Sequence, residues 1–319
     1  MQNHHKFSTF AWLVLVYNLM VIAWGAYVRA TGSGAGCGAH WPLCNGEIIP
    51  RSPEIETMVE FSHRVSSGLT LVLAILLVIF AYRRFSRGSL VRKGAVFTLF
   101  FTLTEAMVGA GLVLFELVAQ NASITRALSM MLHLINTYLL LGSLTLTSWW
   151  SSQGETGWLR WPGVQGVVLM VALVSLLVLG ASGAIAALGD TLFPVASLGE
   201  GIQQELSPTA HFLVRLRVLH PLIAASAGVY LLVAVTWLRR RVRTPAFMRL
   251  TNILLGIFVF QLILGAVNVI LLAPVWLQMV HLVVSDLIWI TLVLSVEVVF
   301  SRRESLKGFT HQPIEVAVE

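Results

Sequence analysis

The sequence predicts an all-α integral membrane protein whose eight transmembrane helices form two pseudo-symmetric four-helix bundles. Its composition is 57% hydrophobic and 11% charged, with a mean hydropathy of +0.82, a balance that soluble domains rarely show. The chain contains eight apolar runs, each near the roughly 20 residues that a ~30 Å hydrocarbon core requires. The two halves also resemble each other. The runs are 9–28, 62–82, 94–116, 129–150, 163–187, 216–238, 250–273 and 277–300.

The basic residues predict the orientation of these runs. They gather in "RRFSRGSLVRK" (83–93), "RRRVRTPAFMR" (239–249) and "SRRESLK" (301–307), which follow the second, sixth and eighth runs. The positive-inside rule places all three segments, and with them both termini, in the cytoplasm. The net charge of +6 therefore indicates membrane topology and gives no sign of a nucleic-acid partner. The first run is longer than the apolar region of a typical signal peptide, so we expect it to be retained.

Similar segments recur in the two halves of the chain. Residues 59–73 resemble 214–228, and corresponding likenesses link the third run to the seventh and the fourth run to the eighth. Because both halves begin on the predicted cytoplasmic side, the repeat is parallel. We therefore expect two bundles, 1–155 and 156–319, each with its own interior site. The aligned pairs are His63 with His220, Gly109 with Gly265, His133 with His281 and, more weakly, Gly25 with Gly180.

Four histidines begin the even-numbered runs, all at the predicted outer side of the bilayer: His63, His133, His220 and His281. A single histidine at this depth commonly makes a hydrogen bond between helices, but two per bundle in matching positions favour a ligand site. Two imidazoles from facing helices suit bis-histidine ligation of a heme iron. Zinc would need three or four ligands, and no Cys-x-x-Cys-His attachment motif is present. The remaining histidines are expected at the surface, with His40 the likeliest exception: His4, His5, His40, His211 and His311.

The halves differ beside the first histidine of each pair. Glu60 lies one helical turn before His63, where a carboxylate can accept a proton or stabilise a developing cation. It could equally pair with Arg64 at the lip of the bundle. Arg217 holds the corresponding place before His220, where it suits a heme propionate or, alternatively, a snorkelling or loop charge.

Two further differences involve carboxylates without an assignable role. Glu105 corresponds to Gln261, and Asp286 corresponds to Tyr138. For Glu105 and Asp286 we expect structural polar contacts, and for Glu105 a partner or protonation because its neighbours are apolar.

The only two cysteines, Cys37 and Cys44, lie in "TGSGAGCGAHWPLCNG" (31–46), in the predicted first outer loop. The matching loop of the second half contains none. A disulfide can persist outside the cytoplasm, and closing this loop would contribute roughly 2–3 kcal/mol in the chain-entropy model. A structural staple and a part of a reactive site both remain open. The glycines would let the loop fold tightly over a flat ligand as a lid.

Together, "RATGSGAGCGAHWPLCNGEIIP", "VEFSHR" and the paired histidines resemble the bacterial heme A synthases, over about residues 9–300. The resemblance implies oxidation of the C8 methyl group of heme O to a formyl group, which yields heme A for cytochrome oxidase. It also implies a bacterial cytoplasmic membrane protein that works beside heme O synthase and cytochrome oxidase assembly. Lipid and an electron acceptor of unknown identity complete the expected partners, and homo-oligomerisation stays open.

The resemblance assigns residues to two heme sites. In the N-terminal half it implies that His63 and His133 hold the substrate heme, with Glu60 as the essential carboxylate. In the C-terminal half it implies that His220 and His281 are the axial ligands of a heme b. It places the cysteine pair at the N-terminal site, able to form a disulfide, while Arg64 and Arg217 are candidate propionate contacts.

Two other functions would use the same histidines. A di-heme cytochrome b that exchanges electrons with a quinone explains them, but it does not explain a carboxylate and a cysteine pair in one half only. A heme transporter would pass heme along the outer face, and it predicts polar groups near the membrane midplane, where only Glu105, Gln261 and Asp286 are candidates.

Overall fold

The computed structural model describes residues 2–51, 53–153 and 159–301, and in these ranges every regular element is a helix. Eight helices are long and apolar enough to cross a membrane, which confirms an all-α multi-pass membrane protein. A shorter helix, α6, lies between the fifth and sixth spans, where the sequence was expected to form a loop, and a second short helix, α7, forms the start of the sixth span. The elements are α1 (Gln2–Ala30), η1 (Ser33–Ala35), α2 (Ile55–Arg84), α3 (Leu90–Leu114), α4 (Ile124–Gln153), α5 (Val164–Leu192), α6 (Leu198–Leu206), α7 (Phe212–Arg217), α8 (Leu219–Arg239), α9 (Pro245–Ile270) and α10 (Val275–Phe300).

Most of the spanning helices extend several residues beyond the apolar runs, and two of them begin at a side-chain cap. The side chain of Ser89 accepts the backbone N–H of Arg92 at the start of α3. Thr244 caps α9 in the same way, and Pro245 occupies the first turn, where its missing N–H costs nothing. Helices α7 and α8 follow each other directly and together form one span, Phe212–Arg239.

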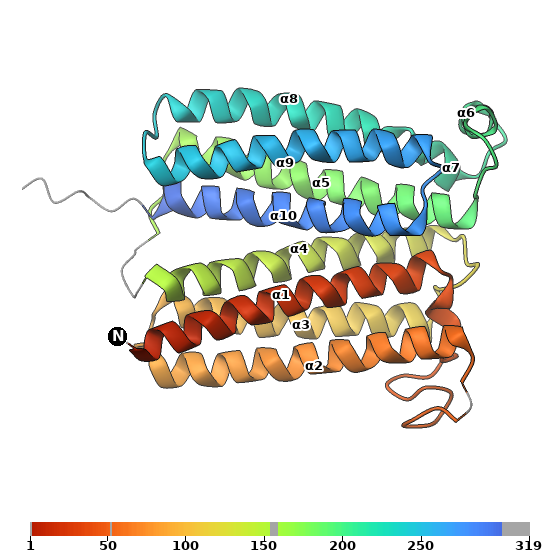
Figure 1. Cartoon of the computed structure of the whole chain (residues 1–319), viewed down its shortest axis with the longest axis horizontal. Coiled ribbons are helices and arrows are strands. Elements are labelled where there is room, and N and C mark those ends of the chain that lie inside the picture. Colours follow the sequence, from red (N-terminus) through yellow and green to blue (C-terminus); the bar gives the residue numbers. More distant parts are fainter. Residues whose placement is uncertain (1, 52, 154–158, 302–319) are drawn as a thin grey trace, which may run out of the picture.

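The helices lie in two layers (Figure 1). In one layer α1, α2, α3 and α4 pack in a closed ring, and in the other α5, α8, α9 and α10 do the same. The segment that contains the expected boundary at 155/156 lies outside the described residues, as do His311 and nearly all of the basic segment 301–307. The connections 83–93 and 239–249 lie together at the end opposite the cysteine loop, on the same side as the N-terminus.

The interface between the layers is built mainly by α4, α5 and α10, whose apolar side chains share one core with α1 and α8. Tyr138 of α4 stacks on Trp289 of α10 with ring centroids 5.1 Å apart, and the Trp289 indole donates to the Tyr138 carbonyl at 2.6 Å. At the N-terminal end, the indoles of Trp149 and Trp150 donate to the carboxylate of Glu297 at 2.7 and 3.2 Å. These contacts join the two rings into one body.

Candidate functional site

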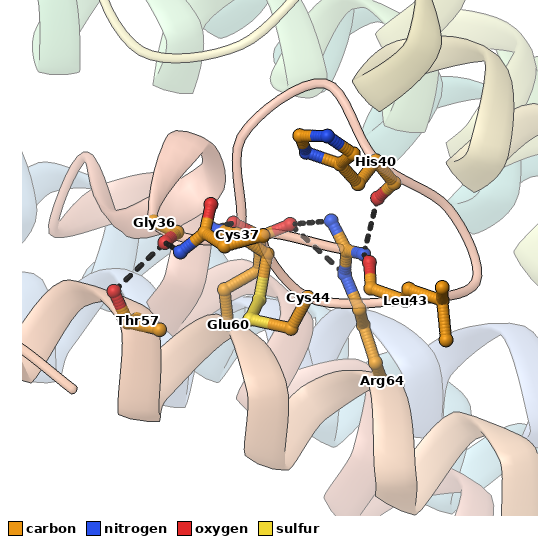
Figure 2. Close-up of polar contacts among 9 residues, drawn as sticks. Gly36, Cys37, His40, Leu43, Cys44, Thr57, Glu60 and Arg64 are labelled. Carbon is orange, nitrogen blue, oxygen red and sulfur yellow. Dashed lines mark hydrogen bonds and ion pairs between the residues drawn. A yellow bond between two sulfur atoms is a disulfide. The ribbon is translucent and has the colours of Figure 1, made fainter. Parts of the chain in front are cut away.

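The cysteine loop is closed by a disulfide between Cys37 and Cys44, whose Cα atoms lie 4.4 Å apart and whose side chains are buried. The loop lies against the first turns of α2 (Figure 2). The Thr57 hydroxyl donates to the Gly36 carbonyl at 2.7 Å. A Cβ atom at Gly36 would lie 2.5 Å from the carbonyl group of Glu56, so this approach requires glycine.

Glu60 joins the loop to α2. Its buried carboxylate accepts the backbone N–H of Cys37 at 2.8 Å through one oxygen, and the Arg64 guanidinium binds the other oxygen through Nε at 3.0 Å and through Nη2. Arg64 also donates to the carbonyls of His40 and Leu43 at 2.5 and 2.7 Å (Figure 2). The carboxylate, guanidinium and loop therefore form one clasp, which we call the Glu60–Arg64 clasp. A propionate would have to share this guanidinium, so that contact of Arg64 stays a prediction.

The four predicted histidines lie in the first three turns of α2, α4, α7–α8 and α10, at the cysteine-loop end, and all are half-buried. Each faces a glycine on a neighbouring helix. A Cβ atom at the glycine would approach Cε1 of the imidazole to between 2.8 and 3.9 Å, so glycine leaves room beside every ring. The pairs are His63 with Gly25, His133 with Gly109, His220 with Gly183 and His281 with Gly265.

One of these pairs corrects the sequence alignment, which matched Gly25 with Gly180. Gly180 instead lies against Tyr138, where a Cβ atom would be 2.6 Å from the phenol ring. The glycine that faces His220 is Gly183, three residues later on the same side of α5. The segment "LGASGA" offers two glycines one turn apart, and similarity alone does not distinguish them.

The ligand atoms suit a flat, two-ligand metal group. The imidazoles of His220 and His281 have centroids 6.4 Å apart, close to the roughly 6 Å that a metal midway between two imidazoles needs with metal–nitrogen bonds of about 2 Å. In the described part of the chain, Nδ1 of His63, His133 and His281 is buried without a hydrogen-bond partner, while Nδ1 of His220 lies 3.0 Å from Ser182 Oγ. Among the described residues no three His, Cys, Asp or Glu side chains gather to hold a metal ion. The arrangement fits bis-histidine heme.

Glu105 has the partners that its apolar surroundings required. The hydroxyl of Thr137 donates to one of its oxygens and the amide of Asn136 donates to the other at 2.5 Å. The first oxygen also lies 3.5 Å from Nδ1 of His133. A carboxylate therefore stands beside the imidazole of one predicted ligand.

Arg217 is buried and paired, so neither snorkelling nor a loop position describes it. Its Nη1 donates to Asp190 at 3.0 Å and its Nε lies 3.5 Å from Glu205, while Nη2 is buried and finds no partner in the part of the chain that the structure describes. Partial burial raises the pKa of Glu205, and Arg217 opposes that rise. The unpartnered Nη2 leaves a donor for an anionic ligand.

The sequence analysis missed Arg29, which crosses between the layers. Its guanidinium donates to the Ala187 carbonyl at 2.7 Å, to the Thr191 hydroxyl at 2.6 Å and to the Gln278 side chain at 2.9 Å. It thereby joins α1 to α5 and α10. An arginine at the end of an apolar run looks like an ordinary interfacial charge, and only its unusual depth distinguishes it.

Two expectations about polar residues are wrong. Asp286 is fully buried in α10, yet neither of its carboxylate oxygens has a hydrogen-bond partner among the described residues. His211, expected at the surface, is half-buried: it stacks on Phe193 and its ring caps the backbone N–H of Leu213. His40 is exposed, and its carbonyl belongs to the Glu60–Arg64 clasp.

The eight apolar helices and the disulfide loop define the class, an all-α multi-pass membrane protein. The comparisons name the family: residues 8–293 match the cytochrome oxidase assembly protein family, COX15-CtaA, and the chain belongs to it. The sequence is 41% identical to a heme A synthase of Halalkalibacterium halodurans over 112 residues, 35% of this chain and 38% of that protein. It is 44% identical to a heme A synthase of Shouchella clausii over 97 residues, 30% of this chain and 32% of that protein.

A longer similarity links the chain to a protoheme IX farnesyltransferase of Thermus thermophilus. The two are 50% identical over 288 residues, 90% of this chain and 47% of the relative. The chain thus spans about half the length of this relative.

Proposed function

We propose that this protein oxidises the C8 methyl group of heme O to a formyl group and so produces heme A. The single observation that carries the proposal is the Glu60–Arg64 clasp: a buried carboxylate one turn from His63 binds a disulfide loop that only the N-terminal half contains. Membership of the family and the similarity to heme A synthases support the same reaction.

In the N-terminal half, we assign His63 and His133 to hold the substrate heme O in the space that Gly25 and Gly109 leave beside their rings. Glu60 receives three hydrogen bonds from N–H donors, so its carboxylate is fixed in place. An anion fixed one turn from His63 can stabilise positive charge that develops on the oxidised substrate. The cysteine loop, attached through Cys37, would cover this site and limit the access of water.

In the C-terminal half, His220 and His281 would hold a heme b, and Nη2 of Arg217 would donate to one of its propionates. When bound, that heme supplies one-electron transfer. No carboxylate is seen at the equivalent place before His220, and the matching loop has no disulfide, so we assign the chemical step to the N-terminal half.

The proposed setting follows from the charges and from the relatives. The basic connections 83–93 and 239–249 lie at one end and the cysteine loop at the other, which supports cytoplasmic termini and an extracytoplasmic loop in a bacterial cell membrane. The name of the Thermus relative supports a partner that farnesylates heme, the role expected of heme O synthase. An electron acceptor and a donor of the inserted oxygen atom, both of unknown identity, would complete the reaction.

Heme extraction tests the proposal. The protein is expressed together with a heme O synthase in a host that makes no heme A, and the extracted hemes are separated by chromatography. We expect heme A to appear only when both proteins are present. A heme-loaded, abundant protein that yields heme O but never heme A would overturn the synthase assignment and favour the di-heme cytochrome. Heme collected outside the cell without oxidation would favour the transporter.

A further inference from the structure

The two predicted heme sites differ in the group that stands beside one imidazole. On α3, Oε1 of Glu105 lies 3.5 Å from Nδ1 of His133. This nitrogen faces away from the position that an axial ligand offers to iron through Nε2, and a carboxylate beside it acts on the ring from behind. This Nδ1 makes no hydrogen bond among the described residues, so the Glu105 carboxylate acts on the ring through its charge at 3.5 Å.

Hydrogen bonds hold the Glu105 carboxylate in place, unlike the side chain of a mobile surface residue. Asn136 and Thr137, which follow His133 by three and four residues on α4, each donate to one oxygen of its carboxylate. Thr104 in turn donates to the Asn136 side chain at 2.7 Å. One helix therefore supplies both the imidazole and the donors that hold the carboxylate against it.

The corresponding position in the other half is neutral and points elsewhere. The amide of Gln261 on α9 donates to the backbone carbonyl of His281 at 2.9 Å, and Nδ1 of His281 has no partner among the described residues. The second imidazole of that half, His220, has a neutral hydroxyl, Ser182, near its Nδ1. In these contacts the charged partner occurs in the N-terminal half alone.

We infer that Glu105 is a positioning residue that fixes the ring of His133 and gives the N-terminal heme a lower reduction potential than the C-terminal heme. A carboxylate beside a ligating imidazole raises its basicity, and its negative charge stabilises the oxidised form of the bound iron. The neutral Gln261 gives His281 no such stabilisation. This difference in reduction potential directs electrons from the N-terminal half, where the substrate is oxidised, toward the C-terminal half. This inference rests on the proposed function, because it takes His133 and His281 as heme ligands.

The test is a redox titration of the purified, heme-loaded protein, followed by optical absorption and by electron paramagnetic resonance. Spectra of His133→Ala and His281→Ala first assign each signal to its half. Glu105→Gln should shift the N-terminal midpoint potential to more positive values and leave the C-terminal one in place. Gln261→Glu is the reciprocal variant, and it should move the C-terminal midpoint in the negative direction. Glu105→Asp, which keeps the charge, should restore most of the wild-type N-terminal potential.

Two results would overturn the inference, and they differ in whether the histidine ligand assignment fails as well. If Glu105→Gln leaves the N-terminal midpoint and resonance signal unchanged while His133→Ala abolishes that heme, Glu105 has no such role and the ligand assignment stands. If His133→Ala alters no heme signal, the ligand assignment itself fails, and the role of Glu105 fails with it.

Discussion

At the residue scale, the environment of Glu60 determines what this carboxylate can do. It is buried, and its two oxygens receive the Cys37 N–H and the Arg64 guanidinium. These donors offset the cost of burying the carboxylate, and removing it leaves the half-buried Arg64 guanidinium without its ion-pair partner. Glu60 is therefore both an electrostatic feature of the proposed site and an attachment point for the loop.

Glu60→Ala should reduce heme A formation by about 100-fold or more, the usual range for loss of a charge that acts in the reaction. Heme extraction and the heme b spectrum are measured on the same membranes, and the spectrum should persist because the C-terminal ligands are untouched. Glu56→Ala is the matched control, since Glu56 is exposed on the same helix. Unchanged product from Glu60→Ala would show that the assignment of Glu60 is wrong.

Asp286 allows a contrasting prediction about stability. Its buried carboxyl has no hydrogen-bond partner among the described residues, so the neutral isostere in Asp286→Asn should leave the melting temperature in detergent unchanged or raise it. Glu297→Gln is the comparison, because Glu297 accepts two indole N–H groups. That variant should lose about 1–3 kcal/mol of protein stability. A large decrease for Asp286→Asn would reveal a partner that the carboxylate needs.

Some individual residues could be predicted from the sequence and others could not. The four histidines and the cysteine pair were found because their residue types are rare in apolar runs and their spacing repeats. The depth of Arg29, the choice of Gly183 over Gly180 and the lack of partners at Asp286 depend on side-chain packing between helices. No local pattern encodes that packing.

At the element scale, the cysteine loop is a compact unit held at three places. The disulfide closes it, Gly36 packs against the backbone of α2, and Arg64 binds the carbonyls of His40 and Leu43. The spanning helices were predictable to within several residues from hydropathy and capping residues. Helix α6 was missed because a short polar helix lacks the long apolar run that identifies a span, whereas α7 belongs to the sixth span, whose start was predicted four residues too late.

Replacing both cysteines, Cys37→Ser with Cys44→Ser, separates the two interpretations of the pair. As a staple, the disulfide should contribute roughly 2–3 kcal/mol, so the variant should melt at a lower temperature, as should the reduced wild-type protein. If the pair is only a staple, heme A formation measured well below the melting temperature should persist. Loss of product from a folded, heme-loaded variant would make the pair part of the reaction.

The glycines beside the histidines allow a prediction for helix α5. A Cβ atom at position 183 would lie 3.0 Å from Cε1 of His220, so Gly183→Val should push that ring aside. The intensity of the heme b spectrum should then decrease strongly. Gly256→Val is the control: Gly256 is exposed within α9 and has no atom within 4 Å of its Cβ position. An unchanged spectrum in Gly183→Val would contradict the placement of a ligand beside this glycine.

At the scale of the whole molecule, two rings of helices share one interface, and each ring carries its histidine pair at the same end. The apolar core crosses the interface through α4 and α10, with the Trp289–Tyr138 hydrogen bond near its middle. Further polar contacts lie toward its two ends: Glu297 with its indoles at one and Arg29 at the other. The sequence predicted two similar halves, but the side chains that join them differ between the halves.

The last prediction tests whether Arg29 joins the rings. Its half-buried guanidinium makes three hydrogen bonds to α5 and α10, and truncation removes all three. Arg29→Ala should therefore destabilise the protein by about 1.5–3 kcal/mol, measured as a lower melting temperature in detergent. Arg29→Lys keeps the charge but loses the planar fork that reaches two helices at once, so it should recover only part of the loss.

Arg51→Ala, at an exposed arginine of the cysteine loop, should have almost no effect because exposed ion pairs contribute little. If Arg29→Ala melts like Arg51→Ala, the apolar interface alone holds the two rings together.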